Sequence, residues 1–162
     1  MKQDITFLDC TLRDGGYYNS WDFENNLTKD YIQSMIAAKV DVVEIGFRFL
    51  KNNDFKGPFA FTSDSFLKTL KIPKGVTLGV MVNGSDLCSE IGYKEALKKL
   101  FPRNASDSPV DLVRFACHFH ELDAAFCAAE ILTAKGYRIG INLMQIADRK
   151  DDEILEMSEM AS

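Results

Sequence analysis

Several features are absent from this sequence, and each absence excludes a class of protein. The four cysteines form no Cys-x-x-Cys pair. No apolar run approaches the roughly 20 residues of a membrane-spanning helix, so we expect no membrane span. There is no cluster of basic residues, and 19 Lys and Arg face 24 Asp and Glu, for a net charge of −5. This balance argues against a nucleic acid or an anionic membrane surface as the main partner.

What the sequence does contain is typical of one globular domain. With 162 residues and 46% hydrophobic content, the chain can fill one packed core but is too short for two comfortable domains. Its first residues lead into no signal-like apolar segment. We therefore expect a cytoplasmic protein whose thiols are reduced.

Short β-rich runs alternate with segments that can carry helices. This pattern is typical of consecutive βα units on a parallel sheet, and it predicts an α/β fold. The five expected strands cover residues 5–9, 40–47, 76–82, 110–117 and 138–144.

Several helices are indicated by apolar spacing and by capping residues. Thr28 is a candidate cap for a helix that runs through Ile36, and Ser63 or Asp64 for one that Pro73 stops. The clearest helix spans Glu121–Lys135, with Gly136 directly after it, and a further helix is expected over Asp148–Met160.

An Arg-Asp pair followed by two glycines ends the first expected strand. A guanidinium can hold an oxyanion or a carboxylate, and a carboxylate is a hard ligand for a divalent ion. Gly15 and Gly16 would let the backbone turn sharply and approach a ligand closely. The segment around Arg13 and Asp14 is therefore a candidate site, with a solvated turn pair as the alternative.

The run Asp9-Cys10-Thr11-Leu12-Arg13-Asp14-Gly15 closely resembles the strand-1 signature of the DRE-TIM metallolyases, the superfamily that includes 4-hydroxy-2-oxovalerate aldolase. The resemblance implies that Asp14 ligates Mg²⁺ or Mn²⁺ and that Arg13 steadies an enolate oxygen. It also implies a Glu at the end of strand 2, and Glu44 occupies that position.

A second point of resemblance lies at the fourth expected strand. The run Val113-Arg114-Phe115-Ala116-Cys117-His118 is similar to the Val-Arg-Val-Ala-Thr-His of the aldolase branch. His118 would project from the carboxyl end of this strand, where such barrels place their active sites. A metal site shared by His118 and His120 is geometrically possible, but the superfamily's His-x-His ligands lie on strand 7. His120 is expected to face solvent or to cap the following helix, and a structural role is the alternative for both.

Glu44 lies within an apolar strand and so requires a partner. A central parallel strand is usually apolar on both faces, and a buried carboxylate is costly when unpaired. We expect an ion pair with Arg13, in which Arg48 takes part, and a polar contact from Asn83 at the same edge. A strand-end carboxylate in water is the alternative for Glu44.

The sequence departs from the aldolase branch at one catalytic position. Relatives of that branch place a catalytic His three residues after the metal-binding Asp, and here that residue is Tyr17. Tyr can transfer a proton, although its ordinary pKa of about 10 makes it a poor base at neutral pH. Tyr17 is therefore a candidate catalytic residue, and packing alone is the alternative.

The resemblance implies a metal-dependent aldolase that splits a 4-hydroxy-2-oxo acid into pyruvate enolate and an aldehyde, or joins them. A closed (β/α)₈ barrel takes about 250 residues. Residues 1–162 are thus expected to be the N-terminal portion of a catalytic TIM barrel, with about five of eight units, and to be inactive in isolation. A complete, smaller open-sheet domain is the alternative.

Two other functions stay open at this point. One is a Claisen-type synthase or lyase of the same superfamily that uses acyl-CoA, and the other is a non-catalytic α/β binding or assembly module. An uncovered sheet edge also predicts self-association into a homo-oligomer. A dehydrogenase partner is implied by the resemblance alone.

Overall fold

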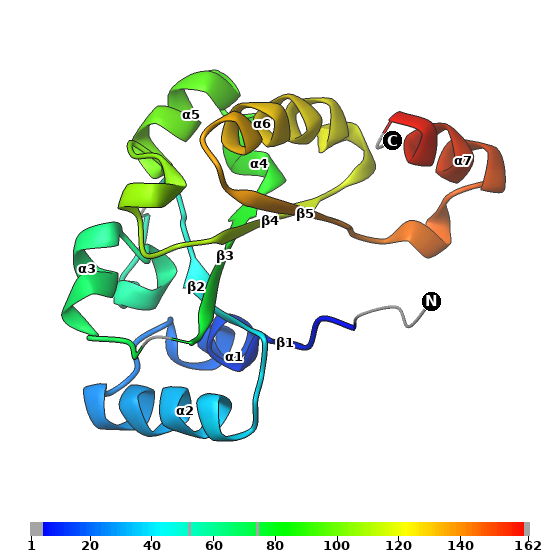
Figure 1. The fold of residues 1–162 in the computed structure, drawn as a ribbon. Helices are drawn as coiled ribbons and strands as arrows, with labels where there is room; N and C mark the ends of the chain where they lie inside the picture. Colours follow the sequence, from blue (N-terminus) through cyan, green and yellow to red (C-terminus); the bar gives the residue numbers. More distant parts are fainter. Residues whose placement is uncertain (1–4, 52, 74, 161–162) are drawn as a thin grey trace.

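The computed structural model describes residues 5–51, 53–73 and 75–160. Five parallel strands follow one another across a single curved sheet, in the order β1-β2-β3-β4-β5 (Figure 1). The strands are β1 Leu8–Asp9, β2 Val42–Phe47, β3 Thr77–Asn83, β4 Leu112–Cys117 and β5 Arg138–Leu143. This arrangement confirms the predicted α/β fold and its resemblance to part of a TIM barrel.

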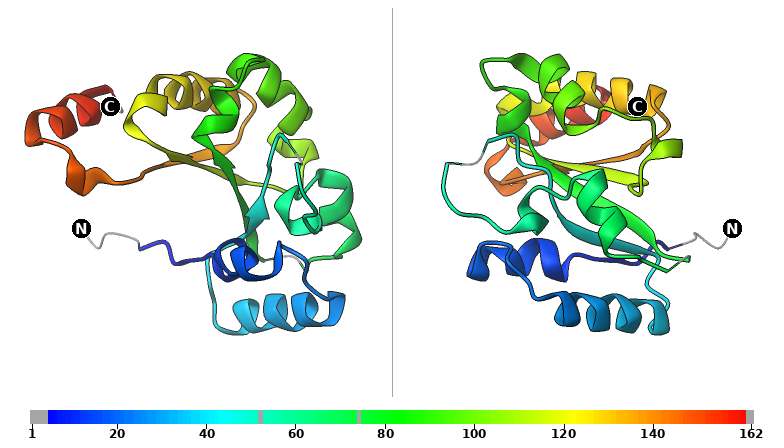
Figure 2. Two further views of the ribbon diagram at one scale, coloured as in Figure 1. Left: turned by 180° about the vertical axis from the view of Figure 1, so that it is seen from behind. Right: turned by 90° about the vertical axis from the view of Figure 1, so that its left-hand side faces the viewer.

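Helices cover the outer, convex side of the sheet, and the sheet is open on the side where residues 5–9 and α7 lie (Figures 1 and 2). The α-helices are α1 Thr11–Asn19, α2 Asn25–Ala37, α3 Asp64–Thr69, α4 Gly84–Leu87, α5 Gly92–Leu100, α6 Leu122–Ala134 and α7 Asp151–Met160. Single 3₁₀ turns are η1 Pro58–Ala60, η2 Ala105–Asp107, η3 Phe119–Glu121 and η4 Ile146–Asp148.

The hydrophobic core lies between the central strands and these helices. All six residues of β2 are buried, as are the five central residues of β3. Each large apolar side chain that is fully removed from water contributes about 1.5–3 kcal/mol. Because the core fixes the central strands, it also fixes the polar side chains that these strands carry.

The predicted capping residues can be compared with the observed ends of three helices, and two of the three predictions are confirmed. Ser63 caps α3, since its hydroxyl accepts a hydrogen bond from the Phe66 N–H at 3.3 Å. Gly136 follows α6 with φ near +88°, a left-handed conformation that favours glycine. The Thr28 cap was wrong: α2 begins at Asn25, and the Thr28 hydroxyl instead donates to the Glu24 carbonyl.

The first strand is shorter than predicted, and the glycine turn was wrong. Both glycines lie inside α1, which begins directly after β1. Asp9 precedes the cap position of this helix, and its carboxylate accepts hydrogen bonds from the Thr11 N–H at 2.9 Å and the Thr11 hydroxyl at 3.1 Å. Gly16 serves packing instead of a turn, since a Cβ there would lie 1.9 Å from the indole of Trp21.

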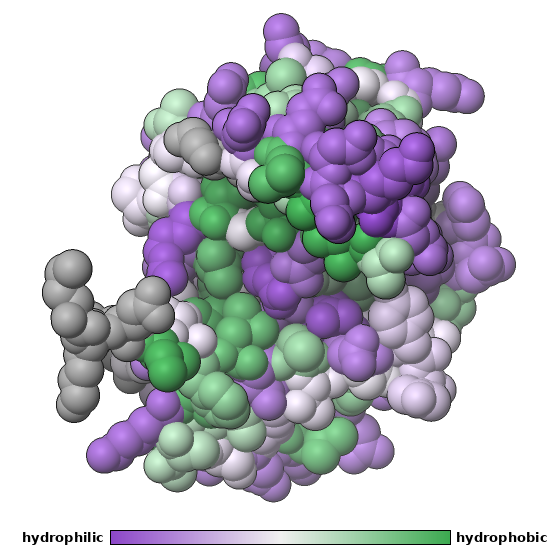
Figure 3. Space-filling view, turned by 90° about the vertical axis from the view of Figure 1, so that its right-hand side faces the viewer, coloured by the Kyte–Doolittle hydropathy of each residue, from purple (hydrophilic) through white to green (hydrophobic). Residues whose placement is uncertain are grey.

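The open side of the sheet exposes apolar side chains near both edges. Ile5 and Phe7 are 87% and 60% exposed beside β1, and no residue of β5 is fully buried. Figure 3 shows apolar side chains gathered on this side around a hydrophilic centre. The predicted self-association stays a prediction.

Across the described part of the chain, no helix combines the length and the apolar character that crossing a membrane requires.

Candidate functional site

Three charged side chains meet across the sheet: Glu44 and Arg114 lie in the middle of β2 and β4, and Arg13 lies in the helix that follows β1. The fully buried Glu44 carboxylate accepts a hydrogen bond from Arg13 Nε at 2.8 Å and a second from Arg114 Nη1 at 3.0 Å. The three residues come from β2, α1 and β4, so elements far apart in the sequence form one cluster. We call Arg13, Glu44 and Arg114 the rim cluster. The ion pair predicted between Arg13 and Glu44 is present.

A signal for Arg114 was present in the sequence, but the prediction missed it. Arg114 lies in the middle of an otherwise apolar strand, and a charged group there requires a partner. Its register partner on β5 is Gly140, where a Cβ would lie 3.1 Å from Arg114 Cγ. The glycine thus leaves room for the arginine stem.

Arg13 is held by contacts on several sides. Its Nη1 donates to Asp14 at 2.9 Å, and its guanidinium lies 5.8 Å from the ring centroid of Phe47. Burial lowers the pKa of Arg13, but the hydrogen bond and the negative charge of Glu44 outweigh it and raise the pKa above its ordinary value. The guanidinium is therefore a permanent cation in a fixed orientation.

Asp14 is the most accessible charge of the site, with a side chain that is 70% exposed. Its carboxylate is a hard oxygen donor of the kind that Mg²⁺ and Mn²⁺ prefer. Among the residues that the structure describes, no group of three or more His, Cys, Asp or Glu side chains is placed to hold a metal ion. Asp14 therefore fits the role of a single ligand, and the described residues do not complete a site around it.

The two histidines lie together at the end of β4. Their rings are stacked with centroids 5.8 Å apart, and the side chain of His120 is 76% exposed, as predicted. The backbone N–H of His118 donates to the buried Glu121 carboxylate at 2.8 Å. Within the described residues, no hydrogen bond or ion pair joins His118 to the rim cluster. Its place in the pocket stays a prediction.

Tyr17 lies one helical turn after Arg13, so both side chains share a face of α1. Its ring is 62% exposed, and its centroid lies 4.7 Å from that of Trp21 and 6.0 Å from that of Phe47. The structure thus places Tyr17 beside Arg13.

Arg48 does not join Glu44, so this expectation was wrong. Its Nη2 donates to Asp64 at 2.5 Å, and its other two donating nitrogens bond the carbonyls of Thr62 and Leu100. The register between β2 and β3 shifts between Glu44 and Gly46, and such a bulge reverses the alternation of side chains. Arg48 therefore faces away from the rim cluster. Asn83 makes no side-chain cap bond at the start of α4.

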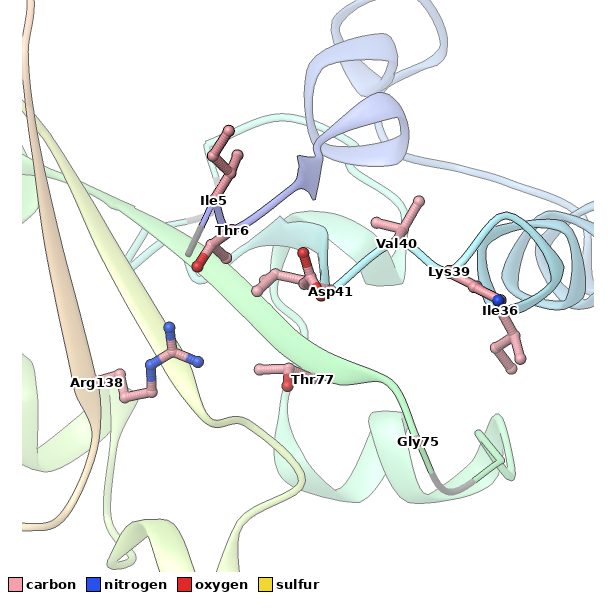
Figure 4. A pocket seen from close by; sticks show the side chains of 10 residues that line it. Ile5, Thr6, Ile36, Lys39, Val40, Asp41, Gly75, Thr77 and Arg138 are labelled. Atoms are coloured by element: carbon pink, nitrogen blue, oxygen red, sulfur yellow. The ribbon is translucent and has the colours of Figure 1, made fainter. Parts of the chain in front are cut away.

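A cavity lies elsewhere, at the amino ends of the strands (Figure 4). It measures about 580 Å³, and its lining includes Asp41, Thr77 and Arg138. Barrels of parallel strands carry their active sites at the opposite, carboxyl ends. This cavity is consequently separate from the rim cluster.

No family model matches the chain. The chain is similar to 4-hydroxy-2-oxovalerate aldolase 6 of Rhodococcus jostii (strain RHA1), with 25% identity over 161 residues, which are 99% of this chain and 43% of the aldolase. It is also similar to a crystal structure described as the "N-terminal domain of a putative aldolase" from Bacteroides vulgatus. The TM-score is 0.77 at 29% identity, covering 93% of this chain and 48% of that one.

Both similarities run along nearly the whole chain, and each spans less than half of the protein it matches. The resemblance to the aldolase branch is confirmed: the chain is a half-barrel similar to the N-terminal part of an aldolase.

Proposed function

We propose that the rim cluster and Asp14 belong to a divalent-metal-dependent aldolase. Its substrate would be a 4-hydroxy-2-oxo acid that yields pyruvate enolate and an aldehyde, or the reverse. One observation carries the proposal: a fully buried carboxylate in the middle of β2 holds two arginines, and an exposed carboxylate lies beside one of them. The similarity to an aldolase supports it.

Arg13 is the residue proposed to stabilise the reacting charge. When the C3–C4 bond of the substrate breaks, negative charge collects on the C2 oxygen of the enolate. A positioned donor at such an oxygen contributes about 10²–10³ in rate. Glu44 fixes Arg13 through Nε and Arg114 through Nη1, so neither cation needs to reorient during the reaction. Glu44 is thus a positioning residue.

The proposal assigns the metal to Asp14. A bound Mg²⁺ or Mn²⁺ would polarise the 2-oxo group and lower the cost of forming the enolate. Asp14 offers an exposed carboxylate to such an ion, and the remaining ligands would come from outside the described residues. Because Arg13 Nη1 also bonds Asp14, the cation site and the oxyanion site would be adjacent.

Two residues are proposed as proton carriers. The Tyr17 hydroxyl lies on the same helix face as Arg13, at the position where the aldolase branch has its catalytic His. His118 follows the last residue of β4 and is the second candidate. Each can move a proton to or from the substrate oxygen or carbon only within hydrogen-bond reach.

We further propose that residues 1–162 form the N-terminal portion of a TIM-barrel catalytic domain. The chain spans 43% of the aldolase that it matches and 48% of the matching crystal chain, and this supports the proposal. The Mg²⁺ or Mn²⁺ cofactor, the homo-oligomer, the dehydrogenase partner and the cytoplasmic location stay predictions.

The test is turnover by the protein at the length that the cell makes. 4-Hydroxy-2-oxopentanoate is supplied with Mn²⁺, and pyruvate is detected by its reduction with lactate dehydrogenase. We expect metal-dependent turnover, a loss of about 10²–10³ in Arg13→Gln, and no change in Arg103→Gln, where an exposed arginine is replaced. Release of free CoA from an acyl-CoA substrate would support the Claisen alternative instead. No turnover with either substrate would contradict the proposal.

A further inference from the structure

An aromatic cluster lies directly beside Arg13. Trp21 is at its centre, with ring centroids 4.7 Å from Tyr17, 5.6 Å from Phe47 and 5.2 Å from Phe49, each in an edge-to-face arrangement. The same Phe47 ring lies beneath the Arg13 guanidinium. Apolar rings and the cation of the rim cluster therefore share one wall of the site.

The neighbouring backbone is shaped to accommodate this cluster. Trp21 is 5% exposed, and its indole occupies the space that a side chain at Gly16 would need. Its Nε1–H donates to the Arg13 carbonyl at 2.9 Å, which ties the indole to the helix that carries Arg13. The rings are thus fixed relative to the guanidinium, and a ligand bound to Arg13 meets them in a constant geometry.

Tyr17 is the member of the cluster that faces outward. Its side chain is 62% exposed, although one edge is packed on Trp21 and Phe47. Positions i and i+4 of a helix lie about 5–6 Å apart, so the Tyr17 ring starts close to Arg13. A 2-oxo acid whose C2 oxygen meets Arg13 brings its C4 substituent within reach of this ring.

We propose that the Tyr17 ring, supported by Trp21 and Phe47, determines substrate specificity by selecting an apolar or aromatic substituent at C4. This inference rests on the proposed function. In the cleavage direction the C3–C4 bond breaks and its electron pair forms the enolate. The C4 hydroxyl loses its proton as the aldehyde carbonyl forms, and C3 then takes up a proton to give pyruvate. The ring contacts the departing aldehyde and takes no part in the proton transfer.

The test uses a binding readout that needs no turnover. Trp21 is the only tryptophan of this chain, so its fluorescence reports on the cluster. The protein at its natural length, loaded with Mg²⁺, is titrated with 2-oxo-4-phenylbutanoate and with 2-oxobutanoate, which lacks the ring. A Trp21→Phe variant identifies the part of the signal that comes from Trp21.

We expect the phenyl compound to bind about tenfold more tightly, as an added aromatic contact and its buried area imply. Tyr17→Phe keeps this preference, because it removes only the hydroxyl. Tyr17→Ala abolishes the preference, and Tyr18→Ala, at a neighbouring residue that is 96% exposed, leaves it intact. Circular dichroism checks that each variant is folded.

Equal binding of the two acids to the native protein would overturn the inference, and so would a preference that survives Tyr17→Ala. If the phenyl compound binds more tightly but no pyruvate is released from any substrate, the aromatic subsite is supported and only the proposed aldolase reaction is contradicted. In a protein that turns over, Tyr17→Phe would lower the rate for all substrates if the hydroxyl carries a proton. Tyr17→Ala would in addition reduce the discrimination between them.

Discussion

One arginine–carboxylate cluster is built around β2 and a second begins directly after its last residue, and the two differ in what can reach them. In the rim cluster Glu44 is fully buried, but the side chains of Arg13 and Arg114 are 15% and 19% exposed. The second cluster pairs Arg48 with Asp64, and there the side chains are 2% and 9% exposed.

The hydrogen bonds sharpen this difference. Arg48 donates from Nε, Nη1 and Nη2 to protein oxygens and stacks 4.6 Å from the Phe101 centroid. The bonds described for Arg13 use Nε and Nη1. A guanidinium that is covered and donates from all three nitrogens to the protein stabilises a fold, whereas one that is oriented but accessible can also act on a ligand. The same pair of residue types therefore serves structure at one place and, we infer, chemistry at the other.

The largest expected effect is on stability at the buried cluster. Arg48→Ala leaves the carboxylate of Asp64 buried without its cation, and we expect a loss of about 3–5 kcal/mol in the free energy of unfolding. Urea denaturation measures this loss. Arg13→Ala, whose site is partly hydrated, should cost less, so an equal or larger loss in Arg13→Ala would contradict the comparison.

The next largest effect is on catalysis at the rim cluster. Glu44→Gln preserves the shape but removes the charge that orients both arginines, and we expect turnover to fall about 10–100-fold, as for other groups that position a catalytic residue. The kinetics of pyruvate release measure this fall in turnover. Asp64→Asn is the matched variant at the buried cluster. If its turnover fell as far while its fold stayed intact, the two clusters would not differ in function.

A matched pair of glycines tests the support beneath Arg13. Gly16→Ala forces the indole of Trp21 to move, and overpacking of this kind costs about 1–3 kcal/mol. In Gly15→Ala the added Cβ has no neighbouring atom within 4 Å. Because alanine favours a helix, this substitution should stabilise the protein by about 0.5–1 kcal/mol. Thermal unfolding of both variants shows whether each substitution raises or lowers the stability. A stabilised Gly16→Ala protein would refute the packing role.

The smallest effect is a pH dependence at Asp9. Burial raises the pKa of this carboxyl, but hydrogen bonds from Tyr31 and Thr11 outweigh burial and leave the pKa below its ordinary value. The folded state then binds protons more weakly than the unfolded state, so this stabilisation is present above about pH 4 and is lost as the pH falls through the folded pKa. The difference in unfolding free energy between the native protein and Asp9→Asn, measured by urea denaturation, should be largest at pH 7 and shrink as the pH falls below about 4. A difference in unfolding free energy that does not change with pH would contradict this role of Asp9.

The sequence predicted the parts of the site that follow from a local rule. A carboxylate within the apolar run of β2 demands a cation, and this rule identified Arg13 as the partner of Glu44. The alternation of strands and helices likewise predicted five parallel strands in chain order.

The rest depended on geometry that no local rule contains. One bulge after Glu44 turns Arg48 to the other side of the sheet. Arg114 reaches Glu44 across β3, a contact between residues 70 positions apart. Gly15 and Gly16 looked like a turn, because nothing in their own segment shows that an indole five residues later requires the space.

The central claim is that Arg13 stabilises an enolate, and it can be tested without knowing the aldehyde. The protein at its natural length is incubated with pyruvate and Mg²⁺ in D₂O, and exchange of the methyl protons is followed by proton NMR. We predict exchange by the native protein and by Arg103→Gln, and a rate about 10²–10³ lower in Arg13→Gln. Exchange at the native rate in a folded Arg13→Gln protein would contradict the account.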